Sequence, residues 1–129
     1  MVETLSIKIY FYYMIHLQRV YQQHQDKEAR FLVERLWPRG VRKASLHFDA
    51  WLKDVAPSGL LRRWFSHDVD KWMEFQRRYR AELDQRPKAW EPILEAARHG
   101  GVILLYSSRD TEHNNAVVLR DYLNKKIRR

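Results

Sequence analysis

The stretch Phe31–Gly40, FLVERLWPRG, combines an apolar run, two ionisable residues and a terminal Trp-Pro-Arg-Gly. A second stretch, Val102–Asn115 (VILLYSSRDTEHNN), has the same order of apolar strand, polar loop and helix start. Short apolar runs bounded by turn residues are typical of buried strands. The two stretches therefore predict strands over 31–37 and 102–106, each delivering a charged loop to one edge of a sheet.

The remaining segments predict one more strand and a series of helices around this sheet. Alternating polarity in 15–21 (IHLQRVY) indicates a short strand. Capping residues and apolar spacing predict helices over 49–55, 58–65, 70–85 and 87–99, and a last helix that starts at Asp110 or Thr111. A helix, a Gly pair, an apolar strand, a loop and a helix in succession indicate α/β layering. The expected fold class is α/β, with a small, mainly parallel sheet covered by helices in a single compact domain.

Length and charge divide the 129-residue chain into three parts. Residues 14–124 are expected to form the domain, 1–13 an N-terminal extension that is either an extra strand or disordered, and 125–129 a basic C-terminal tail. The tail supplies four of the eight net positive charges. The chain has no cysteine, which excludes disulfides, thiol nucleophiles and thiolate zinc sites. No apolar run approaches the roughly 20 residues that a membrane helix needs, and no signal-peptide pattern is present, so a cytoplasmic protein is expected.

Polar residues follow both predicted strands at the point where each strand ends. Parallel strands bring their carboxyl ends to one edge of the sheet, where open α/β sheets bind ligands. Arginines, hydroxyl groups and a helix N-terminus together suit an anion such as phosphate or carboxylate. The candidate ligand-binding residues are Arg35, Trp37, Arg39, Ser107, Ser108, Arg109, Asp110 and Asn114. The alternative is that Arg35 pairs with a structural carboxylate and that Asp110 only caps the last helix.

Whether this site also performs chemistry is left open by the sequence. His113 is the best candidate for proton transfer, together with Asp110 and Ser107, but no nucleophile-elbow signature accompanies it. We expect Glu34 to belong to a buried structural pair, with a role as general base as the alternative. His67-Asp68-x-Asp70 matches no metal-binding spacing, and no phosphate-binding glycine loop is present. No metal and no cofactor are therefore predicted.

Two other classes of function remain open at this stage. The basic tail and the arginine-bearing helices could contact nucleic acid, since neutralising phosphates releases counterions. A helix-turn-helix over 49–66 would be the local form of such a regulator. A structural or partner-binding protein is the other alternative, with Tyr10–Tyr13 as the candidate apolar surface.

From Met14 onward the chain resembles the YeaO-like short branch of domain-of-unknown-function family 488. The matching pieces are IHLQRVY, FLVERLWPRG, the run DAWLKDVAPSGLLRRWFSHDVDKWMEFQRRYRAEL, and VILLYSSRDTEHNNAVVLRDYL. The resemblance implies a compact α/β domain, usually a stand-alone bacterial protein. Its most characteristic polar positions fall on Arg35, Trp37, Pro38, Arg39, Gly40, Lys53, Ser58, His67, Asp68, Arg109, His113 and Asn114. Two departures are that Glu34 stands where Asp is more usual and that residues before Met14 have no counterpart.

Overall fold

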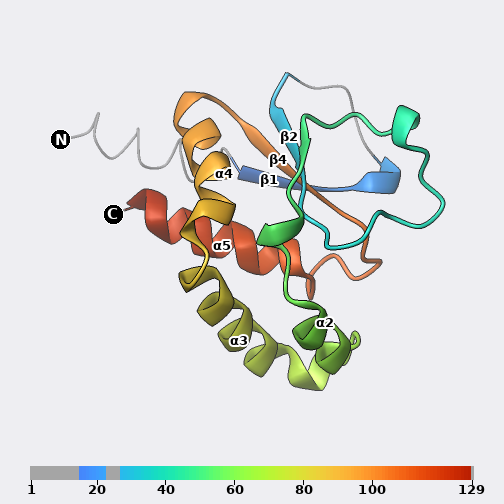
Figure 1. Cartoon of the computed structure of the whole chain (residues 1–129), viewed down its shortest axis with the longest axis vertical. Helices are drawn as coiled ribbons and strands as arrows, with labels where there is room; N and C mark the ends of the chain where they lie inside the picture. The colour runs from blue at the N-terminus through green and yellow to red at the C-terminus, as the bar shows by residue number, and fades with distance from the viewer. Residues whose placement is uncertain (1–14, 23–26, 129) are drawn as a thin grey trace.

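A computed structural model describes residues 15–22 and 27–128 as one α/β domain built on a four-stranded sheet (Figure 1). The strands are β1 (Ile15–Arg19), β2 (Ala29–Leu32), β3 (Ala50–Trp51) and β4 (Val102–Tyr106). Their order in space is β1-β4-β2-β3, and every neighbouring pair is parallel. The predicted fold class is confirmed. The predicted extension 1–13, with Tyr10–Tyr13, lies outside the described residues.

Four α-helices and four short 3-10 turns complete the described part of the chain. The helices are α2 (Gly59–Phe65), α3 (Trp72–Asp84), α4 (Pro87–His99) and α5 (Asn115–Arg128). The turns are η1 (Val20–Gln22), η2 (Lys43–Ser45), η3 (Lys53–Val55) and η4 (Val69–Lys71). The expected helices over 58–65, 70–85 and 87–99 are confirmed within a few residues. Ser58 caps α2 as predicted, because its hydroxyl oxygen accepts a hydrogen bond from the backbone of Leu61 (3.1 Å).

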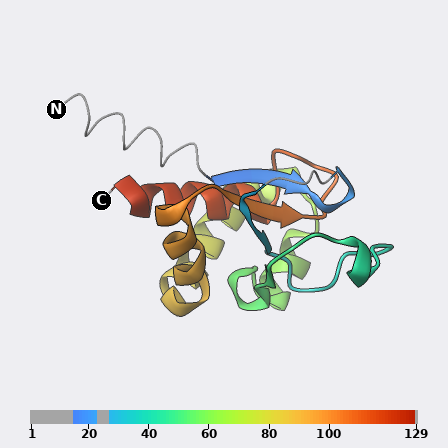
Figure 2. The ribbon, with the colours of Figure 1, turned by 90° about the horizontal axis from the view of Figure 1, so that it is seen from above.

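The central strand β4 is buried along its whole length, as its unbroken apolar sequence predicts. Successive side chains point to opposite faces, so Val102, Leu104 and Tyr106 join the core under the helices. Ile103 and Leu105 pack on the other face. Figure 2 shows α2 and α4 together on one side of the strands.

The second face of the sheet is covered by irregular chain rather than by a helix. Leu46 is buried there, and Trp37, Val41 and Phe48 pack around it against Leu105 and its neighbours. The segment that follows β2 therefore returns across the sheet before entering β3. This path holds the Trp-Pro-Arg-Gly sequence at the carboxyl ends of the strands.

The strand predicted over 31–37 is displaced in the structure to Ala29–Leu32. The Val33 backbone still donates to the carbonyl of Leu105 (3.1 Å). The carbonyl groups of Val33 and Glu34, however, accept hydrogen bonds from side chains instead of from a neighbouring strand. Asn115 donates its amide to the Val33 carbonyl (2.7 Å), and the Trp51 indole donates to the Glu34 carbonyl (2.7 Å). The ladder therefore ends early, and Glu34 belongs to the loop.

The helix predicted over 49–55 is wrong. Asp49 does not cap a helix, because its carboxylate accepts a hydrogen bond from the backbone of Arg30 (2.7 Å) and its own backbone donates to the Arg30 carbonyl (2.8 Å). These contacts extend the pairing of β2 with β3, and only the η3 turn follows. The helix-turn-helix alternative over 49–66 is wrong for the same reason, since its first helix is absent.

The last helix starts at Asn115, four or five residues later than predicted. The Asn114 side chain accepts from the backbone of Val117 (3.1 Å) and so caps α5. Asp110 instead organises the preceding turn, where it accepts from the backbones of Glu112 and His113 (both 2.9 Å). At the other end α5 continues through Arg128, so the basic residues 125–128 form its last turn.

Candidate functional site

A cavity of about 320 Å³ lies at the carboxyl edge of the sheet, and we call it the edge cavity. This position is where parallel α/β sheets place their ligands, and the volume is at the small end of the range for ligand pockets. The loop after β2 meets the loop after β4 there, as predicted, and α2 closes the third side. The lining residues are Glu34, Arg35, Leu36, Trp37, Pro38, Arg39, Ala56, Pro57, Arg62, Phe65, His67, Phe75, Ser107, Ser108, His113, Asn114 and Asn115.

Glu34 joins the two loops. One of its carboxylate oxygens, Oε1, accepts hydrogen bonds from the backbone (2.7 Å) and the hydroxyl (3.1 Å) of Ser107. Burial raises the pKa of Glu34, while the Ser107 hydrogen bonds and the Arg62 charge act in the opposite direction. The expected structural partner is therefore a serine, and in the described part of the chain no cation lies within ion-pair distance of this carboxylate. Glu34 also lines the edge cavity, which its assignment as a structural residue did not anticipate.

Two arginines line the edge cavity without a partner for their guanidinium groups. Arg39 lies in the loop after β2, and Arg62 lies in α2. Within residues 15–22 and 27–128, neither guanidinium makes a hydrogen bond or an ion pair. The Arg39 backbone is held in place, since its carbonyl accepts from the hydroxyl of Tyr21 (2.8 Å). Both side chains are thus available to a ligand.

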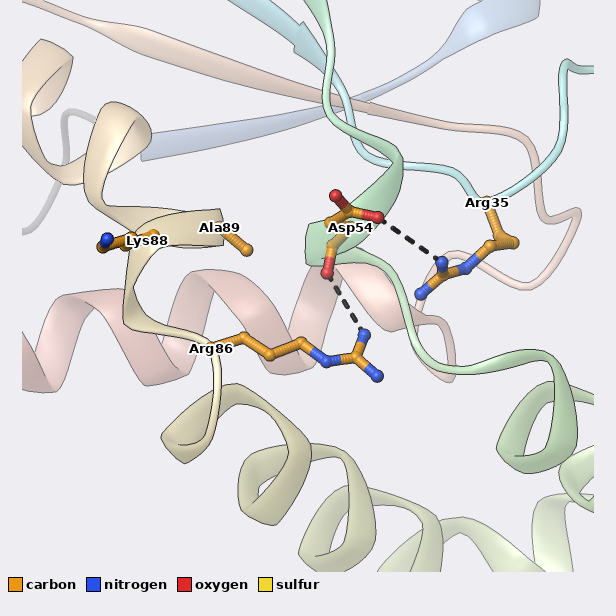
Figure 3. Close-up of a pocket in the computed structure, with 5 residues that line it drawn as sticks. All are labelled: Arg35, Asp54, Arg86, Lys88 and Ala89. Carbon is orange, nitrogen blue, oxygen red and sulfur yellow. Dashed lines mark hydrogen bonds and ion pairs between the residues drawn. The ribbon is translucent and has the colours of Figure 1, made fainter.

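Arg35 is held against the chain that leads into α2. It donates to the carbonyls of Ala56 (3.0 Å) and Pro57 (3.4 Å) and lies 3.7 Å from the Asp54 carboxylate. Figure 3 shows Asp54 between the side chains of Arg35 and Arg86 in a neighbouring cavity of about 490 Å³. Both guanidinium groups already contact oxygens of Asp54 there, so we do not take this second cavity as the ligand site.

Trp37 forms one wall of the edge cavity but is also a packing residue. Its indole donates to the carbonyl of Val41 (2.6 Å). Its ring meets those of Phe48 and Trp51 edge-on, with centroid distances of 5.6 and 5.3 Å. Any ligand contact with Trp37 would therefore use a ring that is already fixed in orientation.

The loop after β4 presents an oriented histidine to the cavity. The Nδ1 atom of His113 lies 3.0 Å from the Asp110 carboxylate, and its ring packs edge-on against Trp72. Hydrogen bonds from the backbones of Glu112 and His113 lower the pKa of Asp110, which favours its ionised form. A hydrogen bond from Nδ1 to this carboxylate leaves Nε2 as the nitrogen that can accept a proton.

Several predicted residues have structural roles in this loop. Asn114 is 3% exposed and uses its amide to cap α5 and to donate to the Asp110 carbonyl (2.9 Å). Ser107 donates to Glu34, and the Ser108 carbonyl accepts from the Arg19 guanidinium (2.9 Å). Arg109 is exposed, and neither Arg109 nor Asp110 lines the edge cavity.

Three polar residues of the lining, Arg62, His67 and Asn115, are not among the site residues that the sequence predicts. Arg62 was considered only within the helix-turn-helix alternative over 49–66. His67 was considered as a metal ligand and as one of the characteristic polar positions of the family, but not as a residue of this site. Ser66 and His67 end α2 with positive φ angles of 45° and 59°, a conformation that is uncommon outside glycine. Histidine is enriched at positive φ, but this preference is much weaker than that of glycine, so a Ser-His-Asp sequence does not predict the direction in which His67 leaves α2.

Three further features of the described residues bear on metal binding, membrane insertion and contact with nucleic acid. No group of three or more His, Cys, Asp or Glu in this part of the chain is placed to hold a metal. None of its helices is long and apolar enough to cross a membrane. Arg77 and Arg78 both pair with Glu74 (2.7 and 2.8 Å), so these helix arginines are already engaged within α3.

Comparison with known proteins identifies relatives along nearly the whole chain. YeaO of Escherichia coli (strain K12) is 38% identical over 110 residues, which cover 84% of this chain and 96% of YeaO. Rv3073c of Mycobacterium tuberculosis (strain H37Rv) is 34% identical over 111 residues, covering 85% and 93% of the two chains. No solved structure matches. The model for the inactive DUF488-N3 subclade matches residues 14–129, so this chain belongs to the DUF488 family, as the resemblance to its YeaO-like branch implied.

Proposed function

We propose that this protein binds a small anionic or phosphorylated ligand in the edge cavity. The observation that carries the proposal is that Arg39 and Arg62 line the cavity while the described residues leave both guanidinium groups unpaired. Arginine is the side chain best suited to hold phosphate or carboxylate, through two parallel hydrogen bonds. His67 and His113 line the same cavity and add polar ring nitrogens to it.

The proposal is for binding rather than turnover. Ser107 donates its hydroxyl to Glu34, and the Ser108 hydroxyl oxygen accepts from the backbone of Asp110 (3.2 Å), so neither serine is paired with His113 as a nucleophile would be. The description of the matching subclade as inactive supports the same choice. His113, held by Asp110, is the residue that would move a proton if the bound ligand reacts.

The proposal is tested by isothermal titration of the full chain with inorganic phosphate, pyrophosphate and ribose 5-phosphate. We expect Arg39→Ala and Arg62→Ala each to weaken binding about tenfold or more, the usual effect of losing a charge-assisted hydrogen bond. Arg98→Ala is the matched control, because Arg98 pairs with Glu95 on the exposed side of α4 (3.1 Å). Arg109→Ala is expected to change the affinity less than about threefold, since Arg109 does not line the cavity.

Two results would contradict the proposal. The first is that the wild-type protein binds none of the three probes. The second is that Arg39→Ala, Arg62→Ala and Arg98→Ala all bind with the wild-type affinity, which would place the anion elsewhere on the molecule.

A further inference from the structure

The Glu34 carboxylate has one oxygen engaged and one oxygen open. Oε1 accepts both hydrogen bonds from Ser107. Oε2 accepts none from the residues that the structure describes, although the side chain lines the edge cavity. A carboxylate oxygen has room for two hydrogen bonds, so Oε2 can accept from a molecule that enters the cavity.

The charges in the edge cavity are therefore of both signs. Glu34 contributes a negative group, whereas Arg39 and Arg62 contribute positive groups from a loop and from α2. An anion placed against Glu34 would be repelled, so the part of a ligand that reaches this carboxylate must be a hydrogen-bond donor. The anionic part of the same ligand belongs with the arginines.

The neighbours of Glu34 also indicate what kind of donor fits. The positive charge of Arg62 acts on the carboxylate, and it would repel an ammonium group brought to the same place. A hydroxyl group has no such cost. The walls of the cavity include Trp37, Phe65 and Phe75, which suit the C–H faces of a sugar ring.

We infer that the ligand is a hydroxylated phosphate monoester of monosaccharide size, whose hydroxyl group donates to Oε2 of Glu34 while its phosphate lies at Arg39 and Arg62. This inference rests on the proposed function and adds the class of ligand. Glu34 is then the residue that selects hydroxyl-bearing anions over bare ones. The cavity of about 320 Å³ is suited to one sugar ring with its phosphate rather than to a dinucleotide.

The test compares two probes that carry the same anion. Ribose 5-phosphate has hydroxyl groups, and pentyl phosphate has a carbon chain of the same length without them. The wild-type protein is expected to bind ribose 5-phosphate about tenfold more tightly in a calorimetric titration, as one hydrogen bond to a charged group would give.

Glu34→Gln tests the role of the carboxylate, because only the hydroxylated probe should lose affinity. Ribose 5-phosphate loses the charged acceptor, so its affinity should fall about fivefold or more. Pentyl phosphate no longer meets a negative charge, so its affinity should stay equal or rise up to about threefold. Circular dichroism and Tm of the variant are recorded beside the titrations, so a loss of folding is recognised separately from a change in recognition.

The outcomes separate the assigned role of Glu34 from anion binding in the edge cavity. If the wild-type protein binds both probes equally, or if Glu34→Gln weakens both together, the assignment of Glu34 to the hydroxyl group is overturned while anion binding stands. If the wild-type protein binds neither probe and no inorganic phosphate, the proposed function itself fails.

Discussion

Asn114 gives the sharpest prediction about how the site is held together. Replacing it with alanine removes the acceptor for the Val117 backbone (3.1 Å) and the donor to the Asp110 carbonyl (2.9 Å). Loss of an N-cap costs about 1 kcal/mol, and a second buried hydrogen bond adds about 1 kcal/mol. Because Asn114 is only 3% exposed, water cannot readily replace either bond. We therefore expect Asn114→Ala to lower the free energy of unfolding by about 2 kcal/mol, or Tm by about 8 °C.

The assay is urea denaturation followed by tryptophan fluorescence and by circular dichroism, with Asn114→Asp as the matched control. Aspartate keeps an acceptor for the Val117 backbone and places a negative charge at the start of α5, but it loses the donor to the Asp110 carbonyl, so it should cost about 1 kcal/mol, which is less than alanine. A stability of Asn114→Ala within about 0.5 kcal/mol of wild type would refute the capping role. If that variant also failed to bind ribose 5-phosphate, Asn114 would have to contact the ligand directly.

Three further substitutions test the packing and the electrostatics. Because burial raises the pKa of Glu34 above its ordinary value of 4.5, ionisation of this carboxyl costs stability at neutral pH, so Glu34→Gln should raise Tm near pH 7. This advantage should shrink as the pH falls to 4.5 and below, where the carboxyl becomes protonated in both states, and a lower Tm of the variant at pH 7 would contradict the prediction. Gly101→Ala should destabilise the protein by about 1–3 kcal/mol in urea, since its Cβ would lie 2.5 Å from Cγ of Glu28, whereas Gly100→Ala, with open space around it, should cost less. Ser58→Ala should cost about 1 kcal/mol in the same assay through loss of the α2 cap, and an unchanged urea midpoint would count against that role.

The parts of the fold that sequence patterns predict are those set by local apolar spacing. The run Val102–Tyr106 is bounded by glycine and serine, and β4 has these exact ends. Phe75, Tyr79 and Leu83 recur at helical spacing and are buried in α3. In both elements the pattern is strong because one face, or both faces, must be apolar for the element to pack.

The errors occur where a contact distant in sequence decides the local structure. Asp49 has the composition of a helix cap, but its carboxylate binds the backbone of Arg30, 19 residues earlier. Glu34 leaves the strand because donors from Trp51 and Asn115 take the carbonyls at the end of β2. No local pattern reports contacts of this kind.

In the candidate site, too, some features follow from local sequence patterns and others depend on contacts between residues distant in sequence. The meeting of the loops after β2 and β4 follows from parallel strands, and the structure joins them through Glu34 and Ser107. The contribution of Arg62 depends on the angle at which α2 packs, which is a tertiary property. The Arg35 side chain points toward the carbonyls of Ala56 and Pro57, and no sequence pattern predicts this orientation either.

The central claim, that an anionic ligand enters the edge cavity, is tested most directly by following backbone amide shifts in NMR while ribose 5-phosphate is added. The account predicts that the largest changes fall on residues 34–39, 62–67 and 107–115, which surround the cavity. Changes confined to residues 125–128 of α5 and the exposed face of α3, with the cavity residues unaffected, would contradict it and favour general polyanion contact instead.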